Sequence, residues 1–177
     1  HQYTAKIDLL PFGNFKSDGD YVGNDIEREK KPKLLVGVAY DYNNDSVKTR
    51  GNTGNYMETT TGFFKTDIKS LFVNSHFKYM GLSFMGEYAS RTSDDAISKN
   101  SDGSLTGDIV NDGSAINFQI GYVTPSNVAI TTRFTNIKFK DIIYPKNDTE
   151  QLTIGLSKYF VKHKLKIQSD LTSEKSM

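Results

Sequence analysis

The stretch "FKYMGLSFMGEY", Phe77 to Tyr88, contains two alternating runs of residues on either side of Met80-Gly81. Residues two apart in a strand share one face of a sheet, and a Met-Gly pair between two such runs is typical of a tight hairpin. Phe77 and Tyr79 share a face before this turn, and Leu82, Phe84 and Tyr88 share one after it. The pattern predicts a hairpin with one apolar face, and it leaves open whether that face meets a protein core or lipid.

The same alternation recurs along the chain, and no segment has a helical period of 3.6 residues. Most segments are near ten residues long, which exceeds the ~5–6 residues of an average strand and approaches the ~9–11 of a tilted membrane strand. We therefore predict one all-β unit over residues 1–177. The expected strands are Tyr3 to Leu10, Lys33 to Tyr42, Thr66 to Tyr79, Leu82 to Arg91, Ser114 to Val123, Val128 to Lys138, Gln151 to Phe160 and Lys164 to Thr172.

The connections alternate strictly in length. Short turns follow the third, fifth and seventh segments, at 80–81, 124–127 and 161–163, whereas long polar loops follow the second, fourth and sixth, at 43–65, 92–113 and 139–150. In an antiparallel sheet this places all short turns at one end and all long loops at the other, as in outer-membrane barrels. The connection 11–32 is a long exception on the turn side. We expect its second half, "NDIEREKKPK", to form a short helical or irregular excursion that ends at Pro32.

The positions of the aromatic residues favour lipid over a protein core. Tyr79, Tyr122 and Phe160 lie at the turn side of the apolar stripe, and Tyr42, Tyr88 and Phe134 lie toward the loop side. Rings at both ends of an aliphatic band are typical of the two interfaces of a membrane barrel. The sequence thus predicts a transmembrane antiparallel β-barrel, and the alternative is a soluble lipocalin-like or sandwich domain.

The composition excludes several other classes of protein. The 22 basic and 21 acidic residues leave a net charge of +1, which argues against a nucleic-acid partner. Cysteine is absent, so disulfide frameworks and thiolate metal sites are excluded. The apolar run at Leu34 to Tyr40 is too short for a membrane-spanning helix, which needs ~18 residues.

Several stretches resemble one family of proteins. They are "YTAKIDLLPFGNF", "GDYVGNDIEREKKPKLLVGVAYDYN", "FKYMGLSFMGEYASR", "INFQIGYVTPSN" and "SKYFVKHKLKIQSDLT". Together they resemble the carboxyl-terminal half of the phosphate-selective porin O and P family, in its Bacteroidetes-type form. The resemblance implies a porin of about sixteen strands in the outer membrane of a Gram-negative bacterium, contact with lipid and lipopolysaccharide, and a homotrimer.

The chain departs from that family in two ways. It has about eight expected strands rather than sixteen, and it stops at Ser176-Met177 rather than on an aromatic residue. We therefore expect these strands to form about half of a wider barrel wall. Phosphate selectivity is not carried over, because in the family it depends on basic residues that would lie mostly in the other half.

If the apolar stripe faces lipid, the opposite face lines a pore. The basic residues expected there are Arg133, Lys166, Lys6, Arg91, Lys78 and Lys164, and the acidic ones are Asp8, Glu87 and Asp170. Arg133 and Lys166 are the strongest candidates for solute contact because both lie within strands. The alternative is that they form cross-strand ion pairs with Glu87, Asp8 or Asp170.

The expected function is passive diffusion of small hydrophilic solutes with a weak preference for anions such as phosphate. The alternative is a non-conducting barrel that acts as a receptor or as a scaffold in a larger surface complex. We expect no enzymatic activity, because His76 stands without a GxSxG motif or a second aligned histidine. No cofactor or metal is expected: "NSDGS" at 100–104 lacks the ligand order of a calcium loop, although the Asp-rich loop 94–112 could hold divalent cations.

Overall fold

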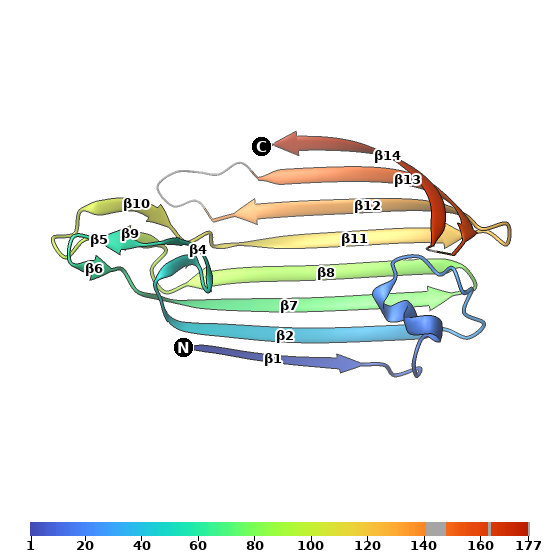
Figure 1. The fold of residues 1–177 in the computed structure, drawn as a ribbon, viewed down its shortest axis with the longest axis horizontal. Coiled ribbons are helices and arrows are strands. Elements are labelled where there is room, and N and C mark those ends of the chain that lie inside the picture. Colours follow the sequence, from blue (N-terminus) through green and yellow to red (C-terminus); the bar gives the residue numbers. More distant parts are fainter. Residues whose placement is uncertain (141–147, 163, 177) are drawn as a thin grey trace.

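The structure is a computed structural model that describes residues 1–140, 148–162 and 164–176. Its main feature is an eight-stranded sheet with the order β1-β2-β7-β8-β11-β12-β13-β14 (Figure 1). All neighbouring strands in this sheet are antiparallel. The strands are β1 (Gln2–Leu9), β2 (Lys33–Ser46), β7 (Thr66–Tyr79), β8 (Leu82–Ser93), β11 (Gly113–Val123), β12 (Val128–Phe139), β13 (Thr149–Val161) and β14 (Leu165–Ser176).

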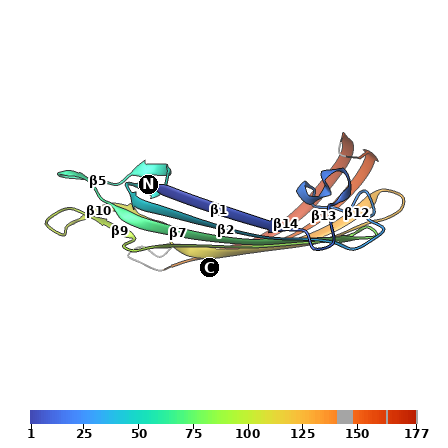
Figure 2. The same cartoon turned by 90° about the horizontal axis from the view of Figure 1, so that it is seen from below.

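The prediction of an all-β antiparallel fold is confirmed, and each of the eight expected segments forms a main strand. The sheet is open, however, because β1 and β14 lie at its two edges and each pairs with one neighbour only. The sheet is bowed, and the turn-side ends of β13 and β14 curl toward the side on which the 11–32 connection lies (Figure 2). Barrel closure is therefore not shown by this part of the chain.

The long loops lie at one end of the sheet, as expected. The 43–65 loop contains two small hairpins, β3 (Lys48–Arg50) with β4 (Thr53–Tyr56) and β5 (Glu58–Thr59) with β6 (Gly62–Phe63); the next loop contains β9 (Ile97–Lys99) with β10 (Leu105–Ile109). Met57, Ile68 and Val110 form a small buried cluster that joins these loops to the sheet. Within the loop expected at 139–150, residues 141–147 lie outside the described residues, as do His163 and Met177.

The two faces of the sheet differ in polarity. The outer face is defined by residues such as Val38, Ile120 and Ile154, whose side chains are 44%, 53% and 55% exposed. Leu34 lies on the same face and pairs with Phe77. No described element forms a second layer over these residues. The inner face is defined by the alternate residues, and the 11–32 connection packs on its turn-side half.

The apolar band on the outer face crosses the sheet obliquely. On β2 it reaches Tyr42, but on β7 it ends two residues lower, at Leu71 opposite Tyr40, because Lys69 is the partner of Tyr42. The last apolar outer residues on the next five strands are Tyr88, Ile116, Phe134, Leu152 and Leu171. Each is level with its predecessor or two residues nearer the turn side, so that four two-residue shifts occur in six strand-to-strand steps.

This shift measures an angle between the band and the strands. A fall of about 1.3 residues per strand, with a rise of ~3.3 Å per residue and a strand spacing of ~4.8 Å, corresponds to a strand tilt of about 40°. Tilts of ~35–45° are typical of strands in membrane barrels. Strands that crossed a flat apolar layer at this tilt would carry an apolar band with the same orientation.

The turn between β7 and β8 depends on Gly81. Met80 and Gly81 have φ values of 49° and 93°, which is the left-handed conformation at both central positions of a type I′ hairpin turn. The Gly81 carbonyl accepts a 2.8 Å hydrogen bond from the Val123 N–H, and a Cβ on Gly81 would collide with the Val123 carbonyl oxygen. Only glycine satisfies both conditions without a backbone shift.

We expect Gly81→Ala to lower the free energy of unfolding by roughly 1–3 kcal/mol, because it adds a collision to an unfavourable φ. Gly103→Ala is the matched control, since Gly103 has a φ of 84° and no neighbour within 4 Å of an added Cβ. Denaturant unfolding followed by circular dichroism measures the difference. Equal losses in the two variants would contradict the assigned contact with Val123.

Candidate pore-lining face

The register places the predicted pore-lining residues on the inner face. Within the strands these are Lys6, Asp8, Lys78, Glu87, Arg91, Arg133, Lys166 and Asp170, and His76 lies on the same face. Lys164 lies in the turn before β14 and is exposed. The strand alternation was therefore sufficient to sort these charges to one side of the sheet. Their surroundings on that side differ widely.

The 11–32 connection, called the inner segment below, covers the turn-side half of the inner face. Its only helical structure is the 3-10 turn η1 (Lys16–Tyr21). The second half, 22–32, is irregular, which is one of the two forms expected for it, and the helical turn lies in the first half. The reason is that the second half gives its polar groups to the sheet and the β7–β8 turn, rather than to an internal helical ladder.

Two basic residues on the inner face of β7, Lys78 and His76, contact the backbone of the inner segment. The Lys78 ammonium donates hydrogen bonds to the Gly19 carbonyl at 2.7 Å and to the Asn24 carbonyl at 3.0 Å. The His76 ring contacts the Asp20 and Gly23 carbonyls at 3.2 and 3.3 Å and stacks on Phe15, with the ring centroids 5.7 Å apart. Both residues are buried, at 2% and 3% exposure. Lys78 was predicted to line the pore, but the structure uses its charge to bind backbone carbonyls.

Two acidic residues of the inner segment, Asp25 and Glu29, bind it to the β7–β8 turn and to itself. Asp25 accepts hydrogen bonds from the Gly81 N–H at 2.7 Å and from the Glu29 N–H at 3.0 Å, and it is 1% exposed. The Glu29 carbonyl accepts from the Met80 N–H at 2.8 Å, and its carboxylate accepts from the Lys16 N–H at 2.6 Å. The segment therefore closes over the β7–β8 turn as well as over the sheet.

Asn24 extends the contact across the sheet to β12 and β13. Its side-chain amide donates to the Tyr159 hydroxyl at 3.0 Å, and its side-chain oxygen accepts from the Thr131 hydroxyl at 3.1 Å. Ile26 packs beside it on Val123 and Tyr159. The two Asn24 contacts join residues more than a hundred positions apart, so alternation alone did not reveal them. One feature of the sequence pointed to these contacts. The connection 11–32 is much longer than the other turns at its end of the sheet, and polar residues are concentrated at 24–29 within it.

A polar pocket of about 220 Å³ lies next to Asn24 on the inner face. Arg133, Lys166 and Asp170 line it together with neutral polar side chains such as Gln119 and Thr153. Arg133 and Lys166, the two strongest sequence candidates, are thus brought to one pocket by β12 and β14. Its walls can supply two positive charges and several hydrogen-bond donors to a hydrated anion.

The expected cross-strand ion pairs of Arg133 and Lys166 are not formed among the described residues. Lys166 donates to Gln168 at 3.1 Å, and Glu87 accepts from the Asn117 amide at 2.8 Å. Lys6 does pair with an acid, but with Asp8 of its own strand at 2.7 Å. Solute contact by Arg133 and Lys166 stays a prediction, and the structure leaves their charges directed at the pocket.

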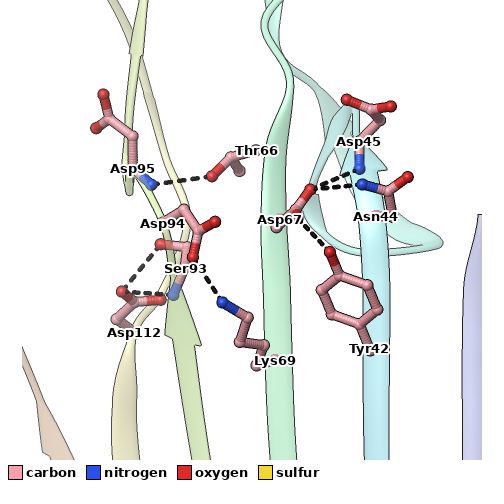
Figure 3. Close-up of polar contacts among 10 residues, drawn as sticks. All are labelled: Tyr42, Asn44, Asp45, Thr66, Asp67, Lys69, Ser93, Asp94, Asp95 and Asp112. Carbon is pink, nitrogen blue, oxygen red and sulfur yellow. Dashed lines mark hydrogen bonds and ion pairs between the residues drawn. The ribbon is translucent and has the colours of Figure 1, made fainter.

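The loop-side ends of the strands are capped by carboxylates (Figure 3). Asp67 accepts hydrogen bonds from the Tyr42 hydroxyl, from the Asn44 side-chain amide at 3.0 Å and from the Asp45 N–H at 2.9 Å. Three donors from β2 therefore meet one carboxylate of β7. This arrangement ties the first long loop to the end of the sheet.

The acids of the 94–112 loop are likewise used by protein groups. Asp94 forms an ion pair with Lys69 at 2.8 Å, and Asp112 accepts from the Ser93 N–H and hydroxyl at 3.0 and 2.9 Å (Figure 3). The "NSDGS" stretch is a hairpin turn between β9 and β10, in which hydrogen bonds from the hydroxyl and N–H of Ser104 lower the pKa of Asp102. No group of three or more histidines and acids among the described residues could hold a metal ion.

Comparisons with protein-family models, with curated proteins and with solved structures found no match. The porin resemblance therefore stays a prediction. In the described part of the chain no helix has the length and apolar character needed to cross a membrane.

We expect Lys78→Met to loosen the inner segment, because it leaves two carbonyls without donors while keeping the bulk of the side chain. Hydrogen bonds to charged groups contribute about 1.5–3 kcal/mol each, so tryptic cleavage at Arg28 and Lys30 should be roughly tenfold faster or more. Lys6→Met is the control: it removes an inner-face charge, 58% exposed, with no hydrogen bond to the segment. Equal cleavage rates in both variants would argue against Lys78 as an anchor.

Proposed function

We propose that the chain forms part of the wall of an outer-membrane β-barrel porin, through which small hydrophilic solutes diffuse passively. The observation that carries this proposal is the oblique apolar band on an uncovered outer face. A protein core has no reason to keep an apolar edge that falls steadily across seven neighbouring strands, whereas a lipid layer crossed by strands with a tilt of about 40° would produce that geometry. Outer-membrane lipid and lipopolysaccharide would be the contacts of this face, and a Gram-negative outer membrane its location.

The open sheet is consistent with a wall that continues beyond these strands. The outer face of β14 carries Ile167 and Leu171, 67% and 78% exposed, and that of β1 carries Ile7, 67% exposed. Neither strand contains a proline, which is one device that protects the edges of soluble sheets, and the register irregularity of the β13–β14 pair lies at its turn end, between Tyr159 and Val161. The closed barrel, its sixteen strands and the homotrimer remain proposals drawn from the resemblance.

The inner face supports a weak preference for anions. Arg133, Lys166 and Arg91 supply positive charge there, while Asp170 and Glu87 reduce it. Basic residues on a lumen wall attract anions by a Coulomb interaction that salt screens over ~8–10 Å. The mixture of signs favours small hydrophilic solutes in general, with no cofactor, no nucleic acid and no chemical step.

A non-conducting barrel is the second candidate, and two observations favour it. The inner segment occupies part of the inner face, and the long loops contain folded hairpins that could bind a partner. Such a protein would act as a receptor or as a scaffold of a surface complex. Planar-bilayer recording separates the candidates, because a porin gives steady open-channel steps and an occluded barrel gives none.

The lipid contact is tested by placing a charge on the outer face. We expect Ile120→Lys to destabilise the protein folded in liposomes by about 2–4 kcal/mol, the cost of a lysine near the bilayer midplane. Asn74→Lys on the inner face is the control, because it faces water and Glu87. Denaturant unfolding from liposomes measures both. If Ile120→Lys is as stable as the control, water or protein rather than lipid covers the outer face.

The charge of the pocket is tested in the open channel. Replacing Arg133 and Lys166 together by Gln should lower the anion-to-cation permeability ratio by roughly twofold or more at low salt, because two lumen charges are lost. Lys138 and Lys175, which lie on the outer face, provide a control double variant with the same change in net charge. Reversal potentials in a salt gradient give the ratio. An unchanged ratio would make the two inner residues structural only.

A further inference from the structure

The loop-side half of the inner face contains an apolar hollow. Phe72, Ala89, Ala115 and Ile137 lie in one cross-strand row on β7, β8, β11 and β12. They line a cavity of about 180 Å³. The turn-side half of the same face carries His76, Lys78, Ser83 and Thr131 instead, so this row is an exception on a polar surface.

The hollow owes its shape to small residues between two large ones. Ala89 and Ala115 form its floor, and the Phe72 ring stands at one side with 44% of its surface exposed. Gly113 in the next row lies so close to the Lys138 carbonyl that a Cβ would collide with it. No described part of the inner segment reaches this row.

A positive charge lies at the edge of the hollow. Arg91 pairs with Ser70 and Gly113 in the adjacent row and lines the same cavity. Its only hydrogen bond within the described residues is a weak one of 3.5 Å to the Ser70 hydroxyl. The acid in the same row, Asp41, already accepts from Gln2 at 2.6 Å and Thr4 at 2.5 Å. The Arg91 guanidinium therefore has donors left for a ligand.

We propose that this hollow binds organic anions that combine a carboxylate with one ring, the class of aromatic carboxylates. The ring would lie on Ala89 and Ala115 against Phe72, and the carboxylate would meet the Arg91 guanidinium, whose planar fork suits two parallel hydrogen bonds. The size agrees, since a cavity of ~150 Å³ holds one benzene ring. That aromatic carboxylates are solutes carried by the protein rests on the proposed function. Their binding to the hollow does not require a conducting pore.

The test is equilibrium binding of 4-fluorobenzoate, followed by fluorine NMR, to the protein expressed from its complete reading frame and folded in detergent micelles. We expect saturable binding that benzoate displaces and acetate does not. Arg91→Gln should weaken it tenfold or more, and Ala115→Leu should abolish it by filling the hollow. Lys175→Gln, which removes a positive charge from the outer face of β14, should leave it unchanged; circular dichroism checks that each variant is folded.

Three results would overturn the proposal. They are no saturable binding to the unchanged protein, as when another part of the polypeptide fills the hollow; equal affinity in Arg91→Gln; and equal loss in Lys175→Gln. The outcome is separable from that of the porin proposal. A protein that binds 4-fluorobenzoate but shows no channel steps keeps this site and loses the porin function, and one that conducts without binding does the reverse.

Discussion

Everything in this structure depends on the parity of the antiparallel pairing. Side chains alternate between the two faces of a strand, so a slip of one residue in any pair would move a whole set of apolar groups to the opposite face. The register keeps Val38, Ile120 and Ile154 on one side and Arg133, Lys166 and Glu87 on the other. The oblique apolar band, the position of the inner segment and the two inner-face cavities described above follow from that single arrangement.

Buried charged groups on the inner face need hydrogen-bond partners, and the inner segment supplies many of them. Burying Lys78, Asp25 and Glu29 is costly unless each finds hydrogen-bond partners. The segment supplies carbonyls to Lys78, and the β7–β8 turn supplies N–H groups to Asp25. Charge that looks like pore lining in the sequence is in part structural charge, which holds a folded connection against the wall.

The inner face is consequently divided along the strands. Its turn-side half is occupied by the inner segment, with the Arg133 and Lys166 pocket at the border. Its loop-side half is open and contains the Phe72 hollow beside Arg91. The two cavities therefore lie in different parts of the inner face, one in the loop-side half and one at the border of the inner segment.

The sequence by itself determined the strands, their antiparallel order, the sorting of long loops to one end and the face of each candidate charge within a strand. All of these follow from local alternation and connection length, whereas Lys164, expected on the pore face, lies in a turn. The sequence did not predict the position of the helical turn in 11–32 or the contact of Asn24 with Tyr159, because both depend on how the segment packs against residues distant in the chain. The tertiary structure alone decided that Lys78 is buried and that Arg133 and Lys166 share a pocket. It also showed that the apolar band is inclined to the strands, because that angle exists only once the register of all eight is known.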